Sequence, residues 1–444
     1  MSLSISLPTK EFQQRRQDLM NQMEPNSIAI VPSANTVLRN GDSEYRFRQS
    51  SDLYYLSGFT EPQSVLVLVP GRAQGQCMLF CQEKDPLKEL WTGKLLGPEG
   101  AIQQLGMDDA FPIGDIDDIL PGLIEGRERV YYAMGKDEQF DHRVMEWVNI
   151  VRKKVRSGAH SPGEFLMLDH RLHEMRLIKS KGELDLMREA GQIAVRAHMR
   201  AMQVCRPGMY EYQVEAEFMH EFYRAGCSGP AYTSIVAGGD NACILHYTEN
   251  DQLLRDGDLL LIDAGCEYQC YASDITRTFP VNGRFSPEQR AIYELVLAAQ
   301  LAAIETVAPG RHWDDPHNAT VQVLTEGLVR LGLLSGKTED LIEQGAYRDF
   351  YMHRAGHWLG MDVHDVGDYK IDGKWRQLEP GMVMTVEPGL YIAPDNQQVE
   401  PRWRGIGVRI EDDVAVTRNG YEILTSGLPK TVAEIESFMA AAPG

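Results

Sequence analysis

Acidic residues at the ends of apolar strands constrain this chain more than any other feature of its sequence. Three segments with the composition of buried strands, 259–262, 382–386 and 405–410, run directly into Asp263, Glu387 and Glu411. A fourth acid, Asp274, lies eleven residues after Asp263, on what we expect to be the next strand of a hairpin. Each buried carboxylate costs several kcal/mol unless it is compensated, so the four either lie apart on the surface or converge around cations.

Histidine is concentrated in one segment. Of twelve histidines in the chain, His353, His357 and His364 fall within twelve residues, among glycine and aromatic neighbours. A single histidine is commonly a core residue satisfied by one hydrogen bond, whereas three together favour a functional site. Four carboxylates and one imidazole suit divalent ions such as Mn²⁺, Co²⁺ or Zn²⁺, and four negative ligand charges fit two such ions.

Two other metal-like patterns fit less well. His353 and His357 have the spacing of a zinc-protease helix, but Arg354 stands where that motif has its catalytic glutamate. Cys266 and Cys270 are four residues apart without a second cysteine pair, so we interpret them as reduced thiols. Serine in a Gly-x-Ser-x-Gly arrangement is absent from the sequence, which excludes a nucleophile elbow.

The length of 444 residues predicts two or three domains. Thr9 is expected to cap a first helix, and Ser180 with Glu183 forms a capping-box pattern at the start of a long helix that ends before Pro207. Strand-like segments before residue 150 are 27–31, 65–69, 77–81 and 130–134. A linker at 156–163 separates this strand-rich part from the part that begins with the long helix. We therefore expect an α/β domain over 1–174 and a second domain over 175–444.

Charge and composition exclude several partners. The chain has 44 lysine and arginine residues against 64 acidic residues, a net charge of −20, which should repel nucleic acid and anionic membranes. It has no apolar run near the ~20 residues that a membrane span needs. Seven cysteines and no signal-peptide pattern at the start of the sequence favour a reducing, cytoplasmic location.

The five candidate ligands match, in type, order and context, those of the pita-bread metallopeptidases, a group that includes methionine aminopeptidase, prolidase and aminopeptidase P. Within that group the chain most resembles bacterial aminopeptidase P. The segments that carry the resemblance are 54–59, 91–94, 232–236, 244–250, 262–265, 356–365 and 386–391. They span nearly the whole chain.

The resemblance implies a fold of the mixed α/β (α+β) class. The C-terminal domain should be a curved pita-bread sheet flanked by paired helices, after a smaller creatinase-like α/β domain. It also implies two divalent ions per chain, with Mn²⁺ favoured over Co²⁺ or Zn²⁺. By resemblance, Asp274 and Glu411 bridge both ions, Asp263 completes one, and His357 and Glu387 complete the other.

The implied activity is hydrolysis of the bond before a proline in the second position of a peptide, by a hydroxide held between the ions. Glu387 would also move protons, His364 would stabilise the oxyanion, and His246 and His353 would line the proline pocket. Prolidase, which acts on Xaa-Pro dipeptides, is the close alternative. A non-catalytic pita-bread binding protein is a further one, although all five ligands are present.

Three more positions complete the expectation. Arg409 lies two residues before Glu411 and is either a supporting and substrate-binding residue beside Asp263, with Tyr232, or a structural arginine. Trp91, in a loop-like context, would reach a neighbouring subunit's site in a dimer of dimers, or simply pack on the surface. Arg354 departs from the family pattern, which usually has glycine there.

Overall fold

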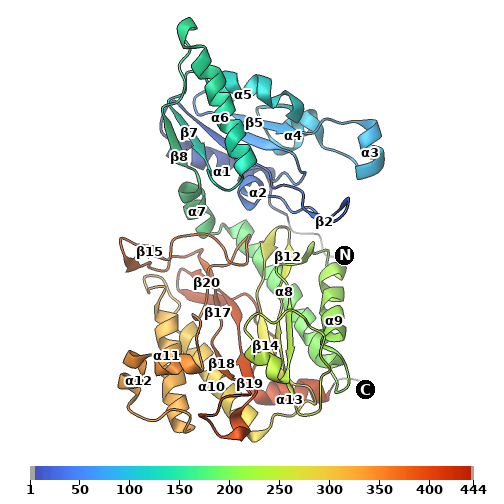
Figure 1. Ribbon diagram of the computed structural model, residues 1–444, viewed down its shortest axis with the longest axis vertical. Coiled ribbons are helices and arrows are strands. Elements are labelled where there is room, and N and C mark those ends of the chain that lie inside the picture. Colours follow the sequence, from blue (N-terminus) through green and yellow to red (C-terminus); the bar gives the residue numbers. More distant parts are fainter. Residues whose placement is uncertain (1–5, 442–444) are drawn as a thin grey trace. The chain divides into compact units, whose positions relative to one another are not determined.

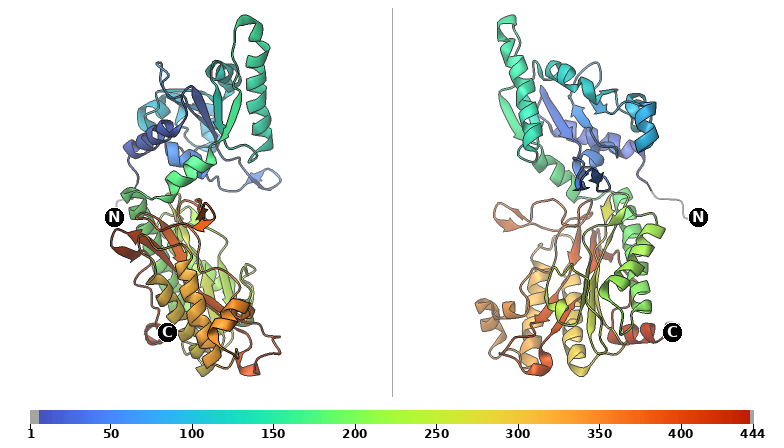
Figure 2. Two further views of the ribbon diagram at one scale, coloured as in Figure 1. Left: turned by 90° about the vertical axis from the view of Figure 1, so that its left-hand side faces the viewer. Right: turned by 45° about the vertical axis from the view of Figure 1, so that its right-hand side comes forward.

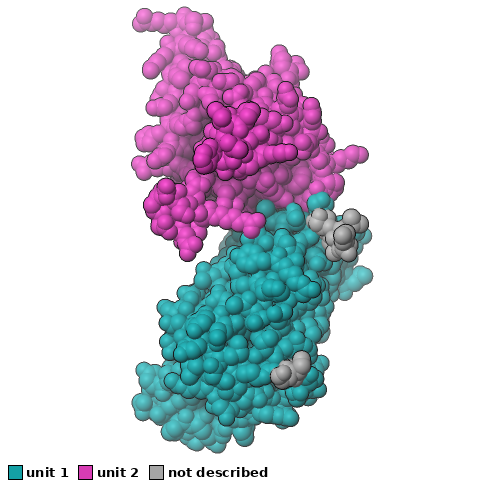
Figure 3. Space-filling model, turned by 90° about the vertical axis from the view of Figure 1, so that its right-hand side faces the viewer, with its two compact units in different colours: residues 1–6, 176–444 teal, residues 7–175 magenta. Residues whose placement is uncertain are grey.

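The computed structural model describes residues 6–441. The chain divides into two compact units, Leu7–Met175 and a second that begins at Arg176 (Figure 3). Within the described residues, every helix is too short or too polar to traverse a lipid bilayer.

The N-terminal unit is built on a six-stranded mixed sheet with the order β6-β5-β4-β1-β7-β8. β1 pairs antiparallel with β4 and parallel with β7, which places it at the centre of the sheet. The strands of this unit are β1 (Ser27–Pro32), β2 (Leu38–Asn40), β3 (Ser43–Glu44), β4 (Val65–Leu68), β5 (Cys77–Cys81), β6 (Asp109–Pro112), β7 (Arg129–Tyr132) and β8 (Glu164–Met167).

The core of this unit lies between the sheet and the helices α5 and α6 (Figures 1 and 2). Trp147 of α6 is 1% exposed and packs with strand residues such as Ile30 and Val67, so burial of large apolar side chains holds this layer together. The helices are α1 (Thr9–Gln22), α2 (Ser51–Ser57), α3 (Pro86–Thr92), α4 (Gly97–Leu105), α5 (Ile116–Ile124), α6 (Glu138–Lys153) and α7 (Asp169–Leu177), which runs into the second unit.

The second unit has the pita-bread architecture, in which short antiparallel ladders form a curved central layer (Figure 1). The ladders are β10-β11-β14, β13-β12-β9, β17-β20-β21 and β18-β19, with the outlying hairpin β15-β16. Their strands are β9 (Gly229–Pro230), β10 (Ile235–Gly238), β11 (Leu259–Asp263), β12 (Cys266–Tyr268), β13 (Tyr271–Ala272), β14 (Thr276–Pro280), β15 (Lys370–Ile371), β16 (Lys374–Trp375), β17 (Val383–Val386), β18 (Gly389–Ile392), β19 (Ile406–Arg409), β20 (Asp412–Thr417) and β21 (Gly420–Ile423).

Two helix pairs accompany these strands, α8 with α9 and α10 with α11, and the members of each pair lie side by side in Figures 1 and 2. Capping boxes fix the starts of α8, at Ser180 and Glu183, and of α10, at Ser286 and Gln289. The helices are α8 (Lys181–Val204), α9 (Glu211–Arg224), α10 (Pro287–Ile304), α11 (Asp315–Arg330), α12 (Thr338–Gln344) and α13 (Val432–Ala440).

Two local expectations were wrong. Thr9 is the first residue of α1 rather than its cap, because Pro8 takes the capping position. The Thr9 hydroxyl instead donates to the carbonyl of Gln104. Trp91 lies in the short helix α3, whose start Asp85 caps by accepting a hydrogen bond from the Leu87 amide. The segment is therefore helical rather than a loop, although none of its side chains is buried.

Candidate active site

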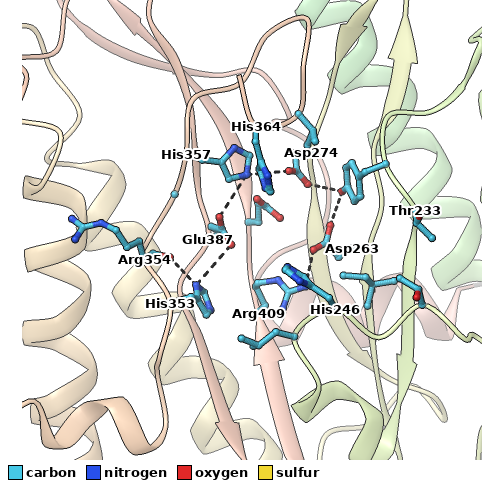
Figure 4. Close-up of a pocket in the computed structure, with 17 residues that line it drawn as sticks. Thr233, His246, Asp263, Asp274, His353, Arg354, His357, His364, Glu387 and Arg409 are labelled. Atoms are coloured by element: carbon cyan, nitrogen blue, oxygen red, sulfur yellow. Dashed lines mark hydrogen bonds and ion pairs between the residues drawn. The ribbon is translucent and has the colours of Figure 1, made fainter. Parts of the chain in front are cut away.

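A cavity of about 440 Å³ in the second unit collects nine of the ten predicted site residues (Figure 4). The five candidate metal ligands, Asp263, Asp274, His357, Glu387 and Glu411, all line it, together with His246, His353, His364 and Arg409. Tyr232, expected beside Asp263, lines it as well. The tenth residue, Trp91, lies in the N-terminal unit with 86% of its surface exposed.

The acidic ligands meet because antiparallel pairing brings their strand ends together. Asp263, the last residue of β11, pairs in register with Thr276, the first residue of β14, and Asp274 lies two residues before that strand. The Thr276 hydroxyl donates to Glu411 at 2.6 Å, which ties β14 to the turn between β19 and β20. Three carboxylates from two distant parts of the sequence therefore face one point.

The segment that carries His357 runs alongside β17. The Thr385 amide donates to the His357 carbonyl at 3.0 Å, and the Glu387 amide donates to the Ala355 carbonyl at 2.8 Å. Gly356 is required between them, because a Cβ atom there would lie 2.0 Å from the Thr385 carbonyl oxygen. This close approach sets His357 beside Glu387, with 3.7 Å between Nε2 and Oε1.

A hydrogen bond on the side away from the cavity fixes the orientation of the His357 ring. Its Nδ1 lies 2.9 Å from the Trp358 carbonyl oxygen. A carbonyl only accepts, so Nδ1 carries the proton and Nε2 faces the cavity as a potential metal ligand. Ligand atoms of Asp274, His357 and Glu411 all lie within 4.8 Å of one another, a spacing that suits a shared cation.

Burial of so many carboxylates makes their charged forms costly. Burial raises the pKa of Glu387 to about 7, and burial together with the charge of Asp274 raises the pKa of Glu411 well above its usual range. The pKa of Asp274 is raised in the same way, by burial and by the neighbouring Asp263. Burial alone would lower the pKa of His357, but its hydrogen bond to Asp274 and the charge of Glu387 raise it to about 9.

This donor set fits divalent cations. Four carboxylates converge on one cavity with an imidazole whose Nε2 faces them, and Arg409 forms an ion pair with one of the four, Asp263. The site is therefore suited to divalent metal ions.

Arg409 and Tyr232 hold the carboxylates of Asp263 and Asp274 in place through hydrogen bonds. Arg409 donates to Asp263 Oδ2 at 2.6 Å, and the hydroxyl of Tyr232 lies 2.5 Å from oxygens of both Asp263 and Asp274. Burial opposes ionisation of Asp263, yet the charge of Arg409 and the hydrogen bonds from Tyr232 and Arg409 together outweigh it and lower the pKa of that carboxyl. Both residues thus lie beside Asp263, where the sequence placed them.

The remaining histidines surround the ligands. The rings of His364 and His357 meet edge to face with centroids 4.4 Å apart. His353 Nε2 lies 2.8 Å from the hydroxyl of Tyr391, which also accepts from Arg409 at 3.0 Å. Tyr391 was assigned no role from the sequence. The only signal for it was its place in segment 386–391, which carries the resemblance. In the structure it lies on the same face of β18 as Gly389, the residue that pairs with Arg409.

Arg354 lies at the edge of the cavity and its side chain points away from the ligands (Figure 4). Its guanidinium forms an ion pair with Asp314 and lies over the ring of Trp375, 4.6 Å from the ring centre. Arg354 therefore forms an anchor at the rim and leaves His353 in the cavity.

Residues 185–418 match the metallopeptidase family M24, and residues 12–131 match the aminopeptidase P N-terminal domain. The chain is 48% identical to the Xaa-Pro aminopeptidase of Escherichia coli K12 over 98% of both proteins, and 48% identical to that of Haemophilus influenzae over 99% of both. Among solved structures, the Pseudomonas aeruginosa aminopeptidase PepP has 65% identity and a TM-score of 0.98, with 99% of both chains covered. Zinc-substituted E. coli aminopeptidase P in complex with product has 47% identity and a TM-score of 0.96, with 99% of this chain and 100% of that chain covered.

The chain therefore belongs to metallopeptidase family M24 and is a metal-dependent peptide hydrolase. Its nearly full-length likeness to bacterial aminopeptidase P, which includes the N-terminal domain of that group, confirms the resemblance expected from the sequence. The pita-bread fold after a smaller α/β unit is confirmed as well.

Proposed function

We propose that this enzyme removes the N-terminal residue from peptides whose second residue is proline. The observation that carries the proposal is the convergence of five metal-ligand side chains in a cavity that His246 and His353 also line. The relatives of similar length support it, since they are named as Xaa-Pro aminopeptidases. A non-catalytic binding role is disfavoured because all five ligands face one cavity.

We propose that Asp274 and Glu411 would be shared by two ions, Asp263 would complete one, and His357 and Glu387 would complete the other, with Mn²⁺ the native metal. A pair of bound divalent ions supplies Lewis acidity, which lowers the pKa of water and polarises a carbonyl at neutral pH. Arg409 and Tyr232 keep the carboxylate of Asp263 in a single orientation. That preorganisation spares the chain the cost of ordering the ligands at each turnover.

The chain's own acid–base groups lie around the ligands. Glu387 has one oxygen 3.7 Å from His357 Nε2 and the other 3.9 Å from His353 Nδ1, so it is placed to take a proton from water and pass it to the leaving amine. His364 is held against His357 and would donate a hydrogen bond to the oxyanion.

A proline in the second position needs an apolar, shape-selective pocket, because its tertiary amide offers no N–H to recognise. His246 enters the cavity from the segment after the 3-10 helix Gly239–Cys243, and His353 enters from the opposite wall (Figure 4). We propose that their rings enclose the proline.

The test compares Xaa-Pro-Yaa, Xaa-Ala-Yaa and Xaa-Pro substrates with enzyme reconstituted with Mn²⁺. Cleavage of Xaa-Pro-Yaa, but not of Xaa-Ala-Yaa, is the expected result. Cleavage of Xaa-Pro alone would identify a prolidase, and equal rates on Xaa-Pro-Yaa and Xaa-Ala-Yaa would exclude proline selectivity.

We further propose a homotetramer in which Trp91 helps to close the site of a neighbouring copy. Its support is the exposed apolar face of α3, where Leu87, Leu90 and Trp91 are 74–86% exposed, a liability for an isolated chain. Trp91→Ala should then lower kcat/KM while metal content stays unchanged. A fully active monomeric wild type would contradict this assembly.

A reducing, cytoplasmic location is proposed on the seven cysteines, which all lie among the described residues and form no disulfide.

A further inference from the structure

The segment that carries His246 has almost no regular structure of its own. After the 3-10 helix Gly239–Cys243, no helix or strand follows until β11 begins at Leu259. His246 itself is exposed at the cavity. A segment of this kind holds a side chain in place only if other parts of the fold tether it.

One buried side chain supplies that tether. Glu211, the first residue of α9, has none of its surface exposed. Its Oε1 accepts hydrogen bonds from the Gly238 amide at 2.7 Å and the Asn241 side chain at 3.1 Å. Its Oε2 accepts from the Tyr247 hydroxyl at 2.7 Å and the Gln252 amide at 2.9 Å. The four donors lie before, beside and after His246.

The contact with Tyr247 matters most for the cavity, because Tyr247 is the residue directly after His246. Its ring is buried with Ile235 and Leu261, and its hydroxyl is fixed by Glu211. Of these two consecutive side chains, Tyr247 is therefore anchored in the core, whereas His246 faces the cavity. A shift of Tyr247 would move His246 with it.

Four hydrogen bonds to one buried carboxylate use its acceptor capacity, and all four come from uncharged donors. A neutral amide cannot replace it, since one of its two ends would present N–H groups to donors. Glutamine would thus keep the size of the side chain while it breaks half of the tether.

We propose that Glu211 is a positioning residue for the proline pocket, which acts on substrate only through the placement of His246. This inference rests on the proposed function, because it takes His246 to be a substrate-binding residue. It assigns to α9 a part in specificity although no residue of that helix lines the cavity.

The experiment is a double-mutant cycle of Glu211→Gln and His246→Ala, assayed on Xaa-Pro-Yaa peptides. We expect Glu211→Gln to lower kcat/KM about 10- to 100-fold, as a misplacement near 1 Å can do. It should divide the loss between KM and kcat as His246→Ala does, and it should add little in the double variant. The matched control is Glu217→Gln on the same helix, which removes only the partly exposed pair with Arg200 and should change kcat/KM less than twofold.

Two further readouts separate placement from general damage. Glu211→Gln should keep the wild-type metal content, and limited proteolysis should cut it selectively within 239–258. If Glu211→Gln fails to fold, Tyr247→Phe removes one donor alone and should give a smaller loss that is again non-additive with His246→Ala.

Additive losses, or kinetics of folded Glu211→Gln equal to wild type, would overturn the inference and leave the proposed function intact. A His246→Ala variant with wild-type kinetics would instead remove the premise that His246 binds substrate.

Discussion

Lys179 Nζ lies 2.9 Å from Asp365 Oδ2, although 186 residues separate them in the sequence, and each side chain is only 1% exposed. Asp365 also accepts from Arg176 at 2.6 Å. Because Asp365 directly follows His364, this buried ion cluster fixes one wall of the active site to the start of the second unit.

Lys179→Met should lower the free energy of unfolding by about 3 kcal/mol, because it leaves a buried carboxylate with one partner fewer. Urea denaturation of metal-loaded protein measures the change. Lys181→Met is the control, since that side chain is 88% exposed and pairs only at the surface with Asp185, so its change should stay below about 0.5 kcal/mol. Equal losses in the two variants would show that burial of the Lys179 pair is irrelevant.

Metal removal should abolish activity and lower the thermal stability of the protein. Without cations, the carboxylates around Glu411 repel one another in a buried site, and bound metal stabilises the folded state by mass action. Chelation followed by dialysis, then calorimetry and assay with and without Mn²⁺, tests both effects. Full activity in protein shown to be metal-free would contradict the assignment of the site.

Glu387→Ala should lower kcat by ~10³-fold or more, because a metal ligand and the proposed proton carrier are lost together. Cys270→Ser serves as the control. That thiol is partly exposed and lies outside the cavity, so its activity should stay close to wild type. A comparable loss in both variants would mean that the role of the thiols has been misjudged.

Acid should destabilise the fold partly through His198. This side chain is fully buried, and its Nε2 lies 2.9 Å from the Ala264 carbonyl oxygen, which only accepts, so Nε2 carries a proton. Burial lowers its pKa from 6.5 to about 4. The folded state therefore binds fewer protons than the unfolded state, and stability that is complete above pH 6.5 is lost as the pH falls toward 4.

The loss from this one group should approach about 3 kcal/mol at pH 4. His198→Gln should remove that part of the slope, as measured by urea denaturation at a series of pH values. Parallel stability curves for the variant and the wild type would contradict the prediction.

The acid-terminated strands could be predicted from the sequence because apolar runs and the acids that follow them are adjacent in the chain. The capping box of Ser180 was predictable for the same reason, since its partner is three residues away. Strands β6 and β8 were missed because they lie at the two edges of their sheet and are only partly buried, so their residues carry no strong apolar pattern.

The residues that hold the site residues in place were harder to predict, because they act through pairs that are distant in sequence. Neither the pairing of Lys179 with Asp365 nor that of Glu211 with Tyr247 leaves a local pattern. Tyr391 was part of a recognised segment, yet its contact with His353 depends on how strand β18 meets the separate loop that carries His353. Sequence therefore predicts which residues carry chemistry better than it predicts which residues hold them.

The hydrogen bond from Thr276 to Glu411 crosses 135 residues, so the two halves of the ligand set cannot be assembled locally. During translation, Asp263 and Asp274 leave the ribosome long before Glu411 has been made. A nascent chain consequently lacks a complete metal site through most of its synthesis and acquires peptidase activity only when the last strands close onto the first. The topology thus delays proteolytic competence until the chain is nearly finished.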